Sequence, residues 1–299
     1  MMNNYIRNKV IRFKDIDDFN CDHIFDCGQC FRWRRMYDGS WTGIAGARIA
    51  NVKYIDETKT VQVTEYSEEE YSKSIDGKKS KDFWFDYLDL GRDYGSIKRK
   101  LSRGDNVMKL SVKSGQGIRI LSQELWETIV SFIISQNNNI PRIKGCIERL
   151  SEVAGEKIKL GREDFNLGDL VPKRIPVPEV LASLTVDDLA SVRLGYRAKY
   201  LIQAGREVIE RGLPENYEEV LALTGVGPKV ANCISLFGLR DMGSFPIDVW
   251  IKRVMHELYG FDEEDKRGMA EYANKHFGEL SGIAQQYLFY YMRGFGKEQ

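Results

Sequence analysis

The feature that most constrains this chain is a short glycine-rich turn that leads straight into a helix. Gly225 and Gly227 flank a single apolar residue, and glycine allows the positive φ angles and close backbone approach that a tight hairpin needs. Pro228 favours the first position of the next helix, because its φ angle is already close to the helical value. The residues before the turn are apolar enough for a short first helix. The sequence therefore predicts a helix-hairpin-helix over about residues 217–239, whose exposed amides at Gly225, Gly227 and Val230 suit a phosphate oxygen.

Lys229 lies at the start of the second helix, where two interpretations are open. The positive end of the helix dipole disfavours a cation there, and burial would disfavour it further. A lysine that is partly uncharged carries a free amine, which is a nucleophile. Cys233 follows four residues later and therefore shares a helix face with Lys229. The alternative is a solvated lysine and a core cysteine on a module that binds DNA without chemistry.

A carboxylate follows the hairpin. Asp248 lies 19 residues after Lys229, in the segment Phe-Pro-Ile-Asp-Val. Aspartate is a common N-cap, so we expect Asp248 to cap a helix over residues 249–258. Capping is compatible with catalysis, because a capping carboxylate is fixed in place and ionised. Lys229 and Asp248 are therefore the candidate catalytic pair.

Composition limits the classes of protein that need to be considered. The 299 residues are 42% apolar and 29% charged, as in ordinary globular proteins. A net charge of zero argues against a protein that coats nucleic acid non-specifically, but it does not argue against a local basic patch that binds DNA. The five cysteines form no regular pattern, which indicates a reducing compartment, and the Cys27–Cys30 pair has no second pair with which to hold zinc. No long apolar run begins the chain, so we expect no signal peptide and no membrane span.

The chain changes character from β to α along its length. The first 80 residues or so contain five short runs rich in β-branched or aromatic residues. Turn signals, of which Asp38-Gly39 is one, separate these runs, and the pattern predicts an antiparallel sheet. Helical periodicity dominates from Ser122, which we expect to be an N-cap. The predicted fold class is α+β. An N-terminal antiparallel β-sheet domain with flanking helices spans residues 1–115, and a mostly α-helical domain containing the helix-hairpin-helix spans residues 116–299.

Local signals place several other helices. Asn139 and Pro141 predict a helix start, as cap and first-turn proline. Thr185 opens a short helix that Gly195 closes. Amphipathic helices are expected over residues 197–211 and 281–294.

Seven motifs, in order along the chain, resemble those of one protein family. They are Gly-Gln-Cys-Phe-Arg-Trp at 28–33, Gln-Gly-Ile-Arg-Ile-Leu at 116–121, Asn-Asn-Asn-Ile at 137–140, Leu-Gly-Tyr-Arg-Ala-Lys at 194–199, Gly-Val-Gly-Pro-Lys-Val-Ala at 225–231, Phe-Pro-Ile-Asp-Val at 245–249 and Ala-Gln at 284–285. The chain resembles the eukaryotic-type 8-oxoguanine DNA glycosylases, a branch of the helix-hairpin-helix DNA glycosylases. The resemblance implies a bifunctional enzyme that excises 8-oxoguanine and cleaves the resulting abasic site by β-elimination.

By the same resemblance, Lys229 attacks C1′ of the damaged nucleotide and forms a Schiff base, while Asp248 stabilises positive charge near the sugar. The residues implied to bind the lesion base are Gly28, Cys233, Gln285 and Phe289. Asn137 and Arg197 are implied to contact the cytosine opposite the lesion, with Arg142 beside them. Tyr196 is implied to act as a wedge that fills the gap left in the duplex by the flipped base. These roles suit a reaction that requires base flipping, although each residue taken alone is more often a turn, surface or core residue.

Two departures from the family pattern stand out. Trp250 occupies a position where the family usually has histidine, and Thr224 replaces a proline before the hairpin. No cysteine follows Cys233, which excludes the iron–sulfur cluster of related branches. The resemblance implies no required cofactor, and it makes the hairpin carbonyls a candidate site for a monovalent cation.

The expected partner is double-stranded DNA containing 8-oxoguanine, bound by a monomer with no membrane association. The expected location is the cytoplasm, with the nucleoid, if the source is prokaryotic, and the nucleus if it is eukaryotic. Two other functions remain open: a non-catalytic protein that binds damaged DNA, and a glycosylase for a different damaged base.

Overall fold

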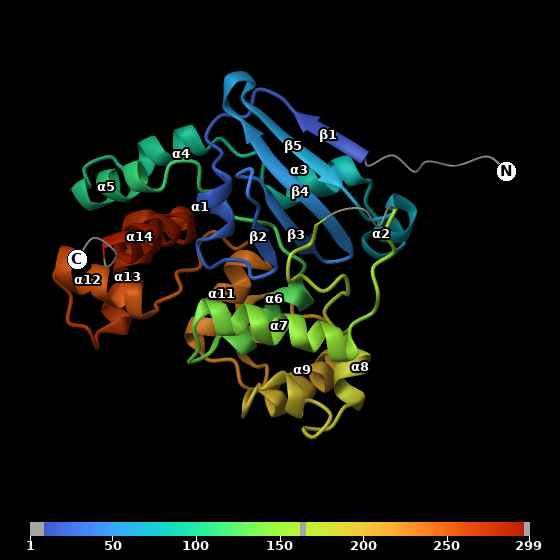
Figure 1. Cartoon of the computed structure of the whole chain (residues 1–299). Coiled ribbons are helices and arrows are strands. Elements are labelled where there is room, and N and C mark those ends of the chain that lie inside the picture. The colour runs from blue at the N-terminus through green and yellow to red at the C-terminus, as the bar shows by residue number, and fades with distance from the viewer. Residues whose placement is uncertain (1–8, 162–165, 296–299) are drawn as a thin grey trace.

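The structure is a computed structural model that describes residues 9–161 and 166–295. Its N-terminal part is one antiparallel sheet with strand order β1-β5-β4-β3-β2, which confirms the predicted sheet (Figure 1). The strands are β1 (Lys9–Phe13), β2 (Trp33–Arg35), β3 (Trp41–Ala45), β4 (Arg48–Ile55) and β5 (Thr60–Glu65). The turn at Asp38-Gly39 joins β2 to β3, and Gly39 has a φ angle of +80°, a conformation that glycine adopts without strain.

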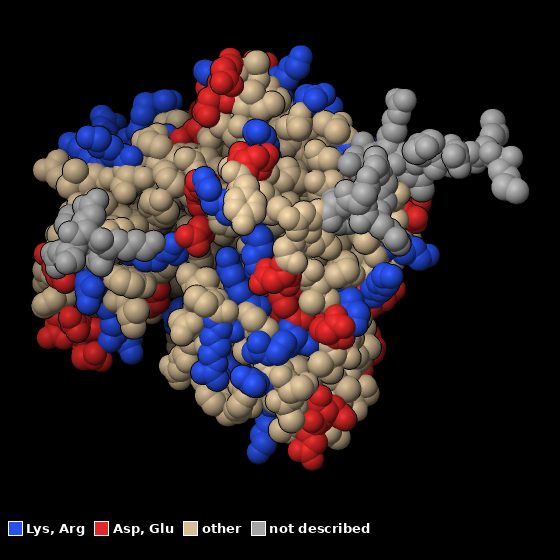
Figure 2. Space-filling model, in the orientation of Figure 1, with Lys and Arg blue, Asp and Glu red and all other residues tan. Residues whose placement is uncertain are grey.

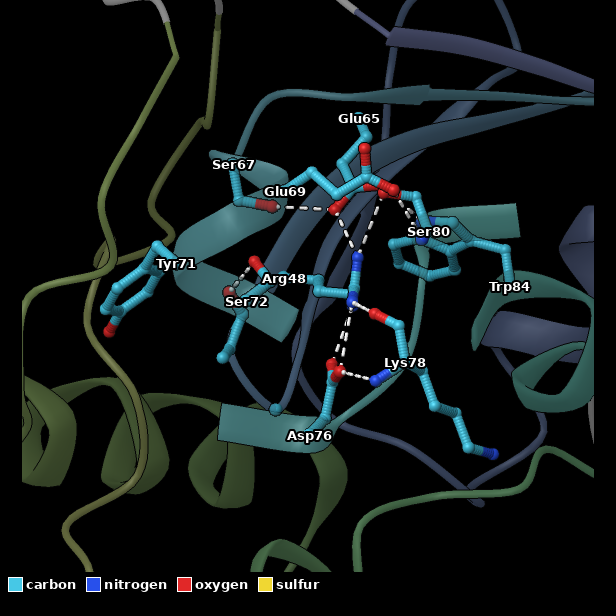
Figure 3. Close-up of polar contacts among 12 residues, drawn as sticks. Arg48, Glu65, Ser67, Glu69, Tyr71, Ser72, Asp76, Lys78, Ser80 and Trp84 are labelled. Carbon is cyan, nitrogen blue, oxygen red and sulfur yellow. Dashed lines mark hydrogen bonds and ion pairs between the residues drawn. The ribbon is translucent and has the colours of Figure 1, made fainter. Parts of the chain in front are cut away.

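Three helices pack beside the sheet: α1 (Cys21–Phe25), α2 (Glu69–Asp76) and α3 (Ser80–Tyr87). A short 3₁₀ turn, η1 (Asp56–Thr58), joins β4 to β5. The fully buried Arg48 ties α2 and α3 to the sheet (Figure 3). Its guanidinium donates to Glu65 at 2.8 Å, to Asp76 at 2.7 Å and to the Lys78 carbonyl at 2.7 Å. Removing one partner of such a buried pair costs about 3–5 kcal/mol, because the other charge is left buried and unpaired, so a substitution of Arg48 or Glu65 alone would strongly destabilise the domain.

The remaining named elements of the described chain are helical. They are α4 (Tyr94–Leu101), α5 (Asn106–Ser114), α6 (Leu125–Ser135), α7 (Ile140–Ala154), α8 (Pro178–Ser183), α9 (Arg197–Arg211), α10 (Tyr217–Leu221), α11 (Pro228–Phe237), α12 (Val249–Tyr259), α13 (Lys266–Phe277) and α14 (Ser281–Phe295), with 3₁₀ turns η2 (Ala190–Val192) and η3 (Gly278–Leu280). α5 lies along α14 and contributes to the helical core, although it precedes α14 by more than half of the chain (Figure 1). The domain boundary at residue 115 therefore stays a prediction.

Most predicted helix boundaries agree with the structure, and two expectations were wrong. Asn139 caps α7 as expected. Ser122 does not cap α6; Glu124 does, because its two carboxylate oxygens accept hydrogen bonds from the amides of Trp126 and Glu127. The helix expected after Thr185 is a series of turns that ends in the 3₁₀ turn η2. Within the described residues, no helix has the length and apolar character needed to cross a bilayer.

Candidate active site

The hairpin joins α10 to α11 as the sequence predicted. Gly225 has a φ angle of +83°, and a Cβ there would collide with the ring of Tyr200, so only glycine fits. Gly227 is extended, with open space around it, and is the N-cap of α11. No side chain caps α11. The amides of its first turn, at Lys229 and Val230, therefore remain free to bind an anion.

Neighbouring elements hold the hairpin in place. Glu207 on α9 accepts hydrogen bonds from the Thr224 amide at 2.9 Å and from the Thr224 hydroxyl at 2.6 Å. The Gln136 side chain donates to the Gly225 carbonyl at 2.9 Å. Sequence reasoning assigned no function to Gln136, because nothing near it in the sequence indicates a contact 89 residues away. The Gly225 carbonyl oxygen has a second lone pair, so it can still bind a monovalent cation while it accepts this hydrogen bond.

Lys229 is half-buried at the start of α11. Its Nζ lies 5.7 Å from the centroid of the Phe132 ring. Cys233 is buried one turn later, where desolvation raises the pKa of its thiol despite the opposing effect of the Lys229 charge. Cys233 is therefore a neutral thiol, which leaves Lys229 as the candidate nucleophile of this pair.

Asp248 caps α12, which confirms the predicted cap. Its Oδ1 accepts hydrogen bonds from the amides of Trp250 at 3.0 Å and Ile251 at 2.9 Å. Burial raises the pKa of the Asp248 carboxyl, while those two amides and the charge of Lys229 act in the opposite direction. The carboxylate is thus held in a fixed position within the electrostatic range of Lys229.

The structure brings together Gly28, in the loop after α1, and Phe289 on α14, two of the predicted lesion-binding residues. Gly28 has a φ angle of +77°, and a Cβ added to it would lie 3.4 Å from Cζ of Phe289. Gln285, one turn before Phe289, is 5% exposed, and its buried Oε1 has no hydrogen-bond partner within residues 9–161 and 166–295. An unpaired buried oxygen carries a free-energy cost, and a ligand that donates a hydrogen bond would remove it.

Three of the predicted opposite-base residues also lie together. The Asn137 side chain donates to the Tyr196 hydroxyl at 3.3 Å, and the Arg197 guanidinium lies 4.6 Å from the centroid of the Tyr196 ring. Tyr196 is 46% exposed, as a wedge requires, whereas Arg197 is 5% exposed and donates to backbone carbonyls. Arg142 is exposed at the start of α7.

Basic side chains gather on the face seen in Figure 2, over α7 and over α4 and α5. Within the part of the chain that the structure describes, no group of three or more His, Cys, Asp or Glu side chains could hold a metal ion. The five cysteines are free and buried, and burial raises the pKa of Cys27 to about 11.

Comparison with known proteins identifies the family. The model of the 8-oxoguanine DNA glycosylase N-terminal domain matches residues 11–129, and the model of the HhH-GPD superfamily of base excision DNA repair proteins matches residues 130–279. The solved structure of MBOgg1 in complex with a low-affinity DNA ligand is 40% identical, with 97% of each chain covered and a TM-score of 0.85. Clostridium acetobutylicum 8-oxoguanine glycosylase/lyase, in complex with double-stranded DNA containing cytosine opposite 8-oxoG, is 37% identical, with 97% of this chain and 99% of that chain covered and a TM-score of 0.82.

The curated protein N-glycosylase/DNA lyase OGG1 of Arabidopsis thaliana is 25% identical over 289 residues, which cover 89% of this chain and 75% of that protein. The helix-hairpin-helix and the helices around it thus define a base excision DNA repair protein of the HhH-GPD superfamily. With its N-terminal domain matched as well, the chain belongs to the 8-oxoguanine DNA glycosylases of that superfamily.

Proposed function

We propose that this protein excises 8-oxoguanine paired with cytosine and then cleaves the abasic strand. The observation that carries the proposal is the position of Lys229 at the start of α11, beside the buried Cys233 and within the electrostatic range of Asp248. Binding alone requires neither a nucleophile nor a buried carboxylate at this place. The partner is double-stranded DNA, which a monomer binds through the hairpin amides and the basic side chains nearby.

The reaction proceeds in two stages. The Lys229 amine attacks C1′ while the bond from C1′ to the base breaks, and the base departs with the bonding electrons. Asp248 stabilises the positive charge that develops at the sugar. The sugar ring then opens to a Schiff base, a proton leaves C2′, and the 3′ phosphate departs by β-elimination. Water hydrolyses the Schiff base and returns the free lysine.

Recognition precedes this chemistry. The target base flips out of the DNA duplex, because its edge and the C1′ atom of its sugar are inaccessible while the base is stacked. Tyr196 enters the gap, while Asn137 and Arg197, with Arg142 nearby, contact the unpaired cytosine. The flipped base lies between Cys233 and Phe289, with its Watson–Crick edge on Gln285.

A labelled duplex with one 8-oxoguanine, incubated with and without borohydride, tests the proposal. Borohydride reduces the Schiff base, so the wild-type protein is expected to form a covalent adduct with DNA. Lys229→Gln is expected to lose both the adduct and base release while still binding the lesion. An adduct of undiminished yield from the Gln variant, or a wild-type protein that binds the lesion without releasing the base, contradicts the proposal. The second result would instead indicate a non-catalytic damage-binding protein.

A further inference from the structure

The loop of residues 26–28, which follows α1, is fastened to α14 by two side chains. The Gln286 side chain donates to the Cys27 carbonyl at 2.6 Å. Arg293 donates from Nη2 to the Asp26 carboxylate at 2.8 Å. These contacts lie on either side of Phe289 along α14, and Gly28 lies against the Phe289 ring. The loop therefore cannot shift along α14 without breaking one of them.

Arg293 contacts the ring as well as the loop. Its side chain is 15% exposed, whereas most arginine side chains are exposed. Its guanidinium carbon lies 5.9 Å from the centroid of the Phe289 ring, and its buried Nη1 has no hydrogen-bond partner among the described residues. Burial of an unpaired N–H is unfavourable, so a surface ion pair alone does not account for this placement.

The loop contacts hold the peptide group that comes just before the Gly28 carbonyl. Gln286 binds the Cys27 carbonyl, and the next carbonyl along the chain is that of Gly28. In the described part of the chain, no group donates a hydrogen bond to this oxygen. Gly28 has a φ angle of +77°, which lies in the left-handed region that residues with a side chain rarely adopt. Gly28 lies against the Phe289 ring, so a shift of the loop at Asp26 moves the residue that carries this free acceptor relative to the ring.

We propose that Arg293, through Asp26 and Phe289, is a positioning residue that sets the distance between the Gly28 carbonyl and the Phe289 ring, and that it thereby controls lesion recognition. The proposal rests on the proposed function, because it concerns the step in which the base is recognised. Arg293 takes no part in the chemistry at C1′. An abasic site has no base to recognise, so strand cleavage there depends on Lys229 and not on this contact.

Two variants on opposite sides of the ion pair test the proposal. Arg293→Met keeps an unbranched apolar stem of similar reach and removes the ion pair, and Asp26→Asn changes only the exposed partner. Single-turnover rates are measured for release of 8-oxoguanine and for strand cleavage at a preformed abasic site in the same duplex. We expect the ratio of the first rate to the second to fall on the order of tenfold or more in both variants, because small displacements of a positioned group are costly. Arg293→Lys, which keeps a cation opposite Asp26, is expected to recover part of the ratio.

His23→Ala is the matched control. The His23 ring packs on Tyr290 with centroids 4.7 Å apart, and its Nδ1 lies 2.6 Å from the Gln116 carbonyl oxygen. Its removal therefore loosens the same interface between α1 and α14 and leaves the side chains of Asp26 and Phe289 unchanged. The ratio is expected to stay at the wild-type value. Equal losses of both rates in Arg293→Met, or the same fall in ratio in His23→Ala, would assign Arg293 a purely structural role. A wild-type protein that cleaves abasic sites but releases no 8-oxoguanine would refute the proposed function itself, and this proposal with it.

Discussion

The Arg197 guanidinium donates a hydrogen bond to the Asn137 carbonyl, with Nη2 and the oxygen 3.1 Å apart. Its Nε donates to the neighbouring Gln136 carbonyl at 2.9 Å. These bonds join the start of α9 to the loop between α6 and α7, and they hold that loop where Asn137 has a φ angle of +44°. Arg197 therefore supports the position of Asn137 in addition to its proposed contact with the unpaired cytosine.

This relationship predicts a double effect for Arg197→Ala. The carbonyls that Arg197 binds lose a buried donor, which we expect to lower the free energy of unfolding by about 1–3 kcal/mol. Excision is expected to lose its preference for cytosine opposite the lesion, because Asn137 is released at the same time. Urea unfolding and excision opposite each of the four bases, below the melting range of the variant, measure the two effects.

Arg142→Ala is the control for Arg197, because its exposed side chain lies in the same region and its loss is expected to leave stability unchanged. If Arg197→Ala keeps wild-type stability and loses activity equally opposite all four bases, Arg197 is only a phosphate contact.

Asp248→Asn separates capping from catalysis. Asparagine is also a good N-cap, so the melting temperature is expected to change little. Excision is expected to slow on the order of 10²–10³-fold, because the variant loses a preorganised charge near the sugar. A cap without a catalytic role would give the opposite pattern, with an early melting transition and normal excision per folded molecule.

The pH profile offers a second measurement on Asp248. Burial raises the pKa of its carboxyl, so the ionised form is lost at a higher pH than for an ordinary aspartate near about 3.9. Wild-type excision is therefore expected to fall on acidification through this raised value, and Asp248→Asn is expected to lack that limb. A matching acidic limb in the variant would assign the titration to another group.

Glu127 predicts a pH dependence of stability. Burial raises the pKa of Glu127 from 4.5 to about 7, and its Oε2 accepts a hydrogen bond from the Gly46 amide at 2.9 Å. The folded state therefore binds the proton more tightly than the unfolded state, which stabilises the protein fully below the unfolded pKa. That contribution is lost as the pH rises through the folded pKa.

Because glutamine does not titrate, Glu127→Gln is expected to gain stability over the wild type as the pH rises from about 5 to about 8, by roughly 3 kcal/mol. Urea unfolding at several pH values measures this difference. The exposed Glu257→Gln is the control and is expected to show no such trend. A constant difference between Glu127→Gln and the wild type across the range would contradict the assignment.

The sequence predicted elements whose cause is local. α9 begins and ends where its periodicity indicated, and Asn139 and Asp248 cap the predicted helices because a capping bond spans only two or three residues. The start of α6 was misplaced because glutamate is not a usual cap. The contact between Asp26 and Arg293 was missed for a different reason. It joins residues 267 positions apart, and a pattern of neighbouring residues cannot predict a contact over that separation.

Gly28 carries the last prediction, which concerns how the lesion is distinguished from guanine. 8-Oxoguanine has a hydrogen on N7, whereas guanine has a lone pair there. A carbonyl facing N7 therefore attracts the lesion and repels guanine, and an unpaired buried polar group costs roughly 1–3 kcal/mol. Sites built on hydrogen bonds discriminate more sharply than sites built on shape. We expect the Gly28 carbonyl to contact N7–H.

8-Methoxyguanine tests this prediction, because it carries oxygen at C8 but no hydrogen on N7. We expect no significant excision of this base by the wild-type protein. Gly28→Val is expected to slow release of 8-oxoguanine, because its φ angle of +77° strains any other residue and its Cβ would lie against Phe289. The variant is expected still to form the borohydride-trapped adduct at an abasic site, where no base is read. Efficient excision of 8-methoxyguanine would show that the C8 substituent is recognised instead, and Gly28 would then have no part in selectivity.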